Sequence, residues 1–257
     1  MKSLVFVIPS LGRAERVGEC AVKTLRDLNV DPALIHIFVA DEEERTRYQK
    51  AVPDVEVVVG KLGIGNQRKF INAYFPKGTR IVSMDDDVLL VKKEENRVVP
   101  LGGNLMDCVN QAYSLCEERG VRFWGVTDSV NGMFMKDEAV FGLRSCAGAF
   151  YGEYAQELDC QSERDHCEDL EKQLKHYLKY GGIIRFNNVG PKQKRYGGGG
   201  VIQQLGGMQE RLAVYEKAAL DLCATYPELI KTKKDYDPKK GITRFKNITH
   251  ERFPSVF

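Results

Sequence analysis

The sequence predicts an α/β protein whose mostly parallel sheet is flanked by helices. Short apolar runs rich in Val and Ile alternate with segments whose apolar residues recur at helical spacing, most clearly in the first half of the chain. Such runs are typical of strands that are buried on both faces. The turns between them are short, and strand–helix–strand repeats of this kind form parallel sheets with right-handed crossovers.

The first half of the chain supplies a regular alternation of elements. Strands are predicted over residues 3–8, 34–40, 55–60 and 79–84. Helices are predicted over residues 14–28, 42–52 and 65–75. The second of these helices begins with acidic residues, which the helix dipole favours, and the third is stopped by Pro76 and Gly78.

The second half is less regular and predicts a mixed arrangement. Helices are expected over residues 104–120, 163–182 and about 207–224. Strands are expected over 121–127 and 183–188, with a strand and a turn over 142–154. We find no internal repeat.

The amino-acid composition is that of an ordinary globular protein, but its charge is unevenly distributed. The chain has 257 residues, 43% of them hydrophobic and 29% charged, which is ordinary for a protein with a sizeable core. The net charge of +2 names no partner, but its distribution is uneven. Residues 231–246 hold seven Lys or Arg against two Asp, and the segment "GPKQKRYGGGG" adds three further bases. The C-terminal third is therefore a candidate for contact with a polyanion.

The cysteines and the termini indicate an intracellular, cytoplasmic protein. There are seven cysteines, an odd number, and no CxxC pair, so we expect reduced thiols. The N-terminal "MKSLVFVIPSLGR" is not a signal peptide. No apolar run is long enough to predict a membrane span.

A parallel sheet of this class binds ligands beyond the carboxyl ends of its strands. Here those ends carry "PSLGR" (9–13), "ADEEE" (40–44), "GKLGIGNQR" (60–68) and "DDD" (85–87). We expect the four segments to line one crevice.

The strand over 79–84 runs directly into Asp85, Asp86 and Asp87. Two unit charges roughly 5 Å apart repel by about 3 kcal/mol at an effective dielectric near 20. Carboxylate oxygens suit Mg²⁺ or Mn²⁺, and such an ion would relieve the repulsion and hold a diphosphate. The alternative is a solvated acidic turn or a helix N-cap. The position after a fully apolar strand favours the metal.

Three further patterns carry weaker signals. The glycines of "GKLGIGNQR" allow close approach of a ligand, and the helix that follows favours an anion, although a flexible turn explains them equally well. This segment is not a Walker motif, which disfavours a P-loop enzyme. Glu168 and Asp169 open a predicted helix and offer a general base, although acids are common there.

The third pattern is the basic, glycine-rich loop, which could close over a phosphate or remain a mobile surface loop. Its candidate binding residues are Lys192, Lys194, Arg195, Tyr196 and Gly198. His166 and Cys167 lack a second ligand pair at zinc spacing, so zinc is disfavoured.

Together, the strand ends "IPS..R", "VADEEE", "GIGNQR" and "SMDDDV" resemble those of nucleotide-sugar glycosyltransferases of the GT-A fold, a Rossmann-like fold. "DDD" matches their DXD motif, and "ED" at 168–169 is similar to their acidic catalytic motif. The closest resemblance is to the TET-associated glycosyltransferases of phages and other genomes, proposed to glycosylate hydroxymethylated pyrimidines in DNA. Chlorella-virus sugar transferases look similar over the first half. The resemblance spans about 1–200.

The resemblance implies roles for individual residues. Asp85 and Asp87 would meet a Mn²⁺ or Mg²⁺ ion and the donor, with Asp169 or Glu168 as the base. Asp86 is counted with the donor-binding residues and expected to point away from the metal, although three consecutive acids leave their roles open. The other donor-binding residues implied are Pro9, Ser10, Arg13, Asp41, Gly63, Asn66, Gln67 and Arg68.

These observations give one predicted organisation and one function. Residues 1–230 would form the GT-A domain, with a nucleotide-sugar half (1–100) and an acceptor half (101–230), followed by a basic extension (231–257). The predicted reaction moves a sugar, glucose from UDP-glucose, onto the hydroxyl of 5-hydroxymethylcytosine in double-stranded DNA. The base would have to be flipped out of the duplex. For a viral protein, the host cytoplasm is the expected location.

Three alternatives stay open at this point. A GT-A enzyme could act on a glycan, lipid or protein acceptor. A non-catalytic nucleotide-binding module would tolerate loss of Asp87. A nucleotidyltransferase would share the sheet and the acidic site, although "PSLGRAER" only partly fits its glycine-rich loop.

Overall fold

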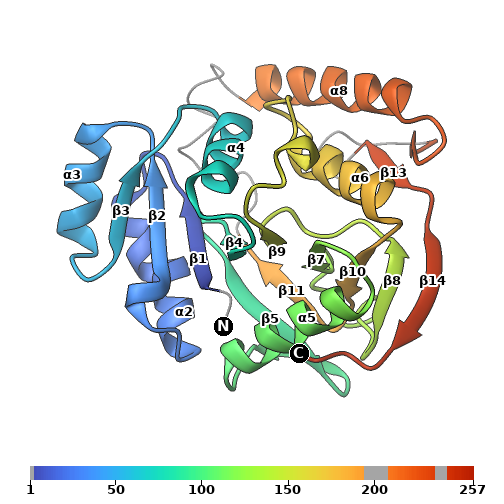
Figure 1. Cartoon of the computed structure of the whole chain (residues 1–257), viewed down its shortest axis with the longest axis horizontal. Helices are drawn as coiled ribbons and strands as arrows, with labels where there is room; N and C mark the ends of the chain where they lie inside the picture. Colours follow the sequence, from blue (N-terminus) through green and yellow to red (C-terminus); the bar gives the residue numbers. More distant parts are fainter. Residues whose placement is uncertain (1–2, 194–207, 235–241) are drawn as a thin grey trace.

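The computed structural model describes residues 3–193, 208–234 and 242–257. Its centre is a nine-stranded sheet in the order β14-β8-β10-β7-β9-β4-β1-β2-β3 (Figure 1). The strands of the N-terminal half are β1 (Leu4–Pro9), β2 (Ile35–Val39), β3 (Glu56–Val59) and β4 (Arg80–Met84). Those of the other half are β7 (Phe123–Val126), β8 (Ala139–Leu143), β9 (Phe150–Tyr154), β10 (Ile183–Phe186) and β14 (Ile248–Phe253).

The predicted α/β class is confirmed by the strand directions. β1 pairs in parallel with β2 and β4, and β2 pairs in parallel with β3. β9 is antiparallel to both β4 and β7, so β7 runs in the same direction as β4. β10 is parallel to β7, and β8 and β14 follow as antiparallel strands. The carboxyl ends of β1, β2, β4, β7 and β10 therefore meet at one edge.

Helices cover both faces of the sheet. The segment α1 (Ala14–Val17), a π-helical turn η1 (Gly18–Val22) and α2 (Lys23–Asp27) packs with α3 (Glu42–Ala51) and α5 (Leu105–Glu118) in the main core. α4 (Ile64–Tyr74) packs on the other face of β1 and β2, where Ile71 meets Val7 and Phe38. α6 (Glu168–Tyr180) lies on that same face, beside Phe123 and Tyr151. Val7 and Ile8 alternate between the two cores, as the pleat of a strand requires.

Several elements were not predicted from the sequence. β5 (Leu89–Glu94), β6 (Arg97–Pro100) and β11 (Val189–Lys192) form a three-stranded sheet. β12 (Ile230–Thr232) and β13 (Thr243–Phe245) form a hairpin against α8 (Met208–Thr225). Single turns, η2 (Pro32–Leu34) and η3 (Leu158–Cys160), complete the description. β14 lies at the edge of the main sheet, within the expected basic extension; the division at residue 230 stays a prediction.

The start of α6 differs from the prediction. The helix begins at Glu168, five residues later than the spacing indicated. Glu171 explains the delay, because its carboxylate accepts hydrogen bonds from Ser162 Oγ and from Arg164 Nε, at 3.2 Å for the latter. Residues 162–164 are thereby held as a loop over the first turn. Cys167, in a left-handed conformation with φ of 57°, then turns the chain into the helix.

Two further features concern the cysteines and the helices. All seven cysteines are free. None of the helices in the described ranges combines the length and the apolar character that a membrane-spanning helix requires.

A polar pair is buried beneath the carboxyl edge. Lys172 Nζ lies 2.7 Å from Glu153 Oε1 and 3.0 Å from Tyr151 Oη, and both charged side chains are only 2% exposed. Glu153 Oε2 accepts further hydrogen bonds from Asn72 and Gln161. The pair ties α6 to β9 and α4, and so fixes the position of the helix that carries Glu168 and Asp169.

His176 lies one turn further along α6 and is fully buried. Its ring packs against Phe123 and Tyr180, with centroid distances of 5.2 and 5.9 Å. Neither ring nitrogen has a hydrogen-bond partner among the residues that the structure describes. Burial lowers the pKa of His176 to about 3, and the nearby Lys172 and Lys179 contribute in the same direction.

Replacing His176 with Phe should flatten the acid side of the stability profile. The unfolded chain binds a proton at this histidine near its ordinary pKa of about 6.5, whereas the folded chain does not, so stability falls as the pH drops through that value. Between pH 7 and 5 the wild-type free energy of unfolding should fall by about 2 kcal/mol more than that of His176→Phe, measured by urea denaturation. An equal fall in both proteins would contradict a buried neutral histidine.

Candidate active site

The four segments at the carboxyl edge of the sheet are joined by side-chain contacts. Ser10 Oγ donates to Asp86 Oδ2 at 2.5 Å, which joins the end of β1 to the acidic segment. Gly12 N donates to Glu44 Oε2 at 2.7 Å, which joins it to the segment after β2. Arg68 Nη2 donates to Asp85 Oδ1 at 3.2 Å, which brings in the glycine-rich segment.

Each of the three consecutive aspartates has a different nearest arginine. Asp85 contacts Arg68, as above. Asp86 Oδ1 accepts from Arg13 Nη1 at 2.9 Å, so its carboxylate is turned towards the end of β1. Asp87 Oδ2 lies 3.3 Å from Arg16 Nη2, and its Oδ1 accepts from Gln193 Nε2 at 3.1 Å. Arg13 Nη1 also lies 3.7 Å from Asp87 Oδ2, so Asp86 and Asp87 share this arginine, whereas Asp85 is turned towards Arg68.

Arg68 connects the acidic strand end to the start of α6. Its side chain is 6% exposed, and its Nη1 lies 2.9 Å from Glu168 Oε1. Nη2 also donates to Gly148 O at 3.0 Å, and the guanidinium lies over the ring of Tyr151. Burial disfavours the charge on Arg68, but Tyr151, Glu168 and Asp85 raise its pKa above the ordinary value.

Asp169 lies against the backbone of Gly148. A Cβ added at Gly148 would stand 2.4 Å from Asp169 Oδ2, so only glycine leaves room for the carboxylate. Asp169 is half-buried, whereas Glu168 is buried. Of the two acids of the "ED" pair, Glu168 is held by Arg68, and Asp169 receives no hydrogen bond from any residue that the structure describes.

Tyr48, which the sequence analysis missed, and Glu44, which belongs to the segment expected to line the crevice, shape the loop after β1. Tyr48 Oη lies 2.7 Å from Ser10 Oγ and accepts from Arg13 N at 2.9 Å. Burial raises the pKa of Tyr48 to about 12, so its hydroxyl stays neutral. Glu44 holds Gly12 N from one turn earlier on α3. Their spacing of four residues puts both on one helix face, and this signal could have identified Tyr48.

Other predicted donor-binding residues hold turns with their side chains. Gln67 accepts from Lys61 N and donates to Val39 O, at 2.7 and 3.1 Å. Asn66 donates to Leu62 O, and Asp41 caps α3 by accepting from Glu44 N at 2.8 Å. Gly63, with φ of 89°, precedes α4, and Pro9 ends β1. Their predicted part in donor binding stays a prediction.

The predicted acceptor loop falls largely outside the described residues. Lys192 ends β11 and is exposed. Lys194, Arg195, Tyr196 and Gly198 lie outside the described ranges. Gln193, next to Lys192, reaches Asp87, which connects β11 to the acidic segment.

Comparison with known proteins identifies the family. A family model described as TET-Associated Glycosyltransferase matches residues 4–200. The chain belongs to this family. It is therefore a glycosyltransferase, as its sequence motifs predicted.

Solved structures agree with this glycosyltransferase fold. Glucosyl-3-phosphoglycerate synthase from Mycobacterium tuberculosis, in complex with Mn²⁺, UDP-glucose and phosphoglyceric acid, matches with a TM-score of 0.53 and 12% identity. The match covers 99% of this chain and 90% of the synthase chain. A structure described as a mycobacterial protein matches with the same TM-score and identity, over 99% of this chain and 87% of that one. The search of curated proteins gives no match.

Among the described residues, negative charge is in excess in the candidate active site. The five carboxylates of residues 85–87 and 168–169 face the three guanidiniums of Arg13, Arg16 and Arg68. Burial raises the pKa of Asp85 to about 6, with Asp86 and Asp87 adding to the effect and Arg68 opposing it. Burial likewise raises the pKa of Glu168 to about 7, against the pull of Arg68.

These residues fit a divalent cation. The donors are carboxylate oxygens, and the charge excess is what a cation would offset. Mg²⁺ is commonly bound by one or two carboxylates together with substrate phosphates, which does not require the three aspartates to converge. Asp85 and Asp87 remain the predicted ligands.

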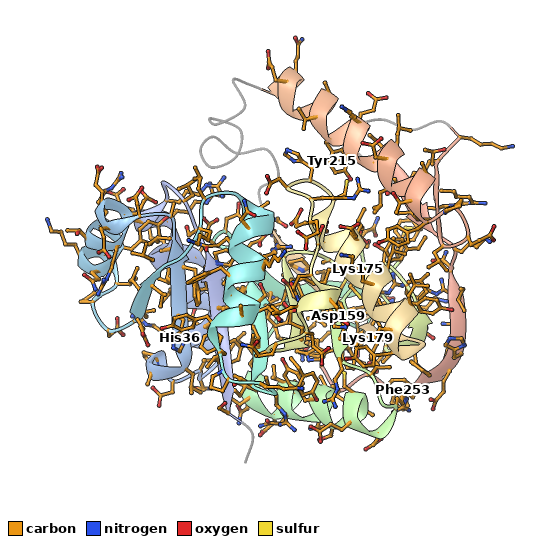
Figure 2. All side chains as sticks on the ribbon, turned by 45° about the horizontal axis from the view of Figure 1, so that its top comes forward. His36, Asp159, Lys175, Lys179, Tyr215 and Phe253 are labelled. Carbon is orange, nitrogen blue, oxygen red and sulfur yellow. The ribbon has the colours of Figure 1, made fainter. Side chains whose placement is uncertain are left out.

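A different acidic group satisfies a geometric criterion for a metal but has another explanation. Within the described part of the chain, ligand atoms of Glu157, Asp159 and Cys160 lie within 4.8 Å of one another. Lys179 Nζ lies 2.8 Å from both carboxylates, and Figure 2 shows Lys179 beside Asp159. The lysine already provides the cation, so we interpret this group as an ion-pair cluster.

The two arginines at the acidic segment should differ in their effect on stability. Arg68→Met leaves the buried Glu168 and the half-buried Asp85 without their cation, which should cost about 3 kcal/mol. Arg16→Met, the matched control, removes a partly exposed contact to Asp87 and should cost at most about 1 kcal/mol. Urea denaturation at pH 8 with a chelator present measures both, and equal losses would contradict the bridging role of Arg68.

Proposed function

We propose that this glycosyltransferase moves glucose from UDP-glucose onto the hydroxymethyl group of 5-hydroxymethylcytosine in double-stranded DNA, with Mn²⁺ or Mg²⁺ as cofactor. The observation that carries the proposal is the arrangement at the carboxyl edge, where the acidic segment and the start of α6 meet around Arg68. It supplies a place for a nucleotide diphosphate next to a carboxylate that can act as a base.

The donor is proposed to bind on the β1 side of the edge. Ser10 and Arg13, held by Tyr48, line the loop after β1 and offer a hydroxyl and a guanidinium to a nucleotide. A UDP-sugar would also fit the proposed cation, because its diphosphate and the carboxylates of Asp85 and Asp87 would bind the same ion. The mycobacterial synthase of similar fold was solved with Mn²⁺ and UDP-glucose, which supports the same donor here.

Asp169 is the better candidate for the base. Its carboxylate receives no hydrogen bond from a described residue, whereas Glu168 is fixed by Arg68 at 2.9 Å. A free carboxylate can accept the proton of the acceptor hydroxyl as its oxygen attacks the sugar. Arg68 holds the backbone beneath Asp169 through Gly148 O and so positions the base. When bound, the divalent cation would neutralise the charge that develops on the departing diphosphate.

Two observations support DNA as the acceptor: the positive charge of the C-terminal segment and the family to which the chain belongs. The family is described as TET-associated, and the chain carries seven Lys or Arg over residues 231–246. Basic segments of this kind meet the phosphates of nucleic acids. A DNA acceptor is also consistent with the proposed cytoplasmic location, the host cytoplasm for a phage protein.

Mass spectrometry of DNA tests the reaction directly. The protein is incubated with Mn²⁺ and one of several UDP-sugars, together with a duplex that contains either hydroxymethylcytosine or cytosine. We expect a mass gain of one hexose per modified base with UDP-glucose, and none on cytosine. Transfer to a glycan or protein but not to DNA would overturn the acceptor, and release of pyrophosphate would overturn the reaction class.

The same assay tests the base. Asp169→Asn should slow transfer by about 10²- to 10⁴-fold, the usual contribution of general-base catalysis. Asp107→Asn, an exposed acid in the first turn of α5, is the matched control and should keep full activity. Full activity in Asp169→Asn would assign the base elsewhere.

A further inference from the structure

A second group of cations lies on the far half of the sheet. Arg185 on β10 and Arg252 on β14 both pair with Val140 of β8, one from each side. Residues that are directly opposite on neighbouring strands share a face, so both arginines project from the same face. Two strand spacings separate their Cα atoms by about 10 Å, which long side chains can span. Arg144 follows the end of β8.

The three arginines share few negative partners. Arg252 Nη1 lies 2.6 Å from Glu138 Oε1. Within the described part of the chain, Arg185 donates to two neutral groups, Ser145 O at 3.0 Å and Asn187 Oδ1 at 2.7 Å. Arg144 Nη2 donates to the hydroxyl of Thr249 at 2.8 Å.

The Nε atom of Arg144 is buried and has no hydrogen-bond acceptor among the described residues, a feature that it shares with Arg13, Arg45, Arg68 and Arg80. Burial lowers the pKa of Arg144, and Arg185 and Arg252 lower it further, while Glu138 acts in the opposite direction. Arg144 thus lies in a locally positive environment, and a bound anion would offset the repulsion between these arginines.

A short segment connects this cluster to the candidate active site. The chain from residue 144 to 148 leads from the end of β8, which is level with the start of β10, to the carboxyl edge, where Ala147 N donates to Val126 O at the end of β7. Gly148, at its end, lies under the carboxylate of Asp169. Four residues span at most about 14 Å, so Arg144 lies no further than that from Gly148. The donor-side arginines follow β1, and this second cluster lies on the opposite side of β4 and β9 (Figure 1).

We propose that Arg144, Arg185 and Arg252 form a binding site for a backbone phosphate of the acceptor nucleic acid. The proposal rests on the proposed function. Guanidinium groups match phosphate oxygens with paired N–H donors, and they hold phosphates more specifically than ammonium groups do. A strand of DNA advances about 3.4 Å per nucleotide, so the contacted phosphate would lie several nucleotides from the reacting base.

Salt dependence of binding tests the site. Fluorescence anisotropy gives the affinity of wild type, Arg144→Gln and Arg252→Gln for a hydroxymethylcytosine duplex over a series of salt concentrations. Each lost phosphate contact should reduce the slope of log affinity against log salt by about 0.9. Arg26→Gln, on α2, is the matched control because this arginine is also partly exposed and is also paired with one carboxylate, that of Asp54. Its slope should equal that of the wild type.

A second readout compares two acceptors. For both cluster variants, the ratio of the KM for the duplex to the KM for free hydroxymethylcytosine nucleoside should rise several-fold, because the nucleoside has no phosphate to lose. A folding defect would act on both acceptors and leave the ratio constant. A constant ratio together with wild-type slopes would overturn the phosphate site.

The two proposals fail in different ways. If the wild-type protein binds the duplex without a salt slope, or not at all, DNA is not the acceptor and the phosphate site falls with it. If the wild type binds and glycosylates the duplex, and both variants keep its slope, the phosphate site alone is wrong.

Discussion

Arg68 is the group on which the candidate active site depends. Its buried guanidinium contacts Asp85 after β4 and Glu168 at the start of α6, so a single cation joins two elements that are far apart in the sequence. A buried charge that loses its partner is costly, and the three groups therefore hold each other in place. The same guanidinium binds Gly148 O, which lies beneath Asp169. The position of the proposed base is thus coupled to that of the acidic segment.

Neighbouring residues hold Arg68 in place, and charged groups lie on two sides of it along the carboxyl edge of the sheet. Lys172 and Glu153 hold Tyr151, over which Arg68 lies, and they anchor α6 one turn after Glu168. On the β1 side, Tyr48 and Glu44 fix the loop that carries Ser10 and Arg13. On the other side, β10, β8 and β14 present the second arginine cluster. Positive charge therefore flanks a negative centre, which is the arrangement that a diphosphate donor and a polyanionic acceptor would need.

The sequence was most informative where local pattern and topology coincide. The four parallel strands and the meeting of their carboxyl ends followed from buried runs alternating with helical spacing, and the structure confirms this class of fold. Contacts between residues far apart in the sequence could not be predicted, because neither segment carries a local pattern that indicates them. Examples are Tyr48 with Ser10 and Gln193 with Asp87. β11 was missed for the same reason, because its pairing with β5 is non-local. β5 and β6 pair locally as a hairpin, and the sequence analysis assigned no strands there. The late start of α6 depends on Glu171 capturing residues of the preceding loop, a tertiary effect that outweighs helical periodicity.

We infer that one divalent cation, bound at the acidic segment, neutralises the excess negative charge around Arg68. Calorimetric titration of Mn²⁺ into the protein, with UDP present, tests it most directly. The account predicts a single site in the wild type, loss of that site in Asp87→Ala, and its retention in Asp159→Asn, since Lys179 already neutralises the second acidic group. Mn²⁺ binding that survives in Asp87→Ala, or disappears in Asp159→Asn, would contradict it.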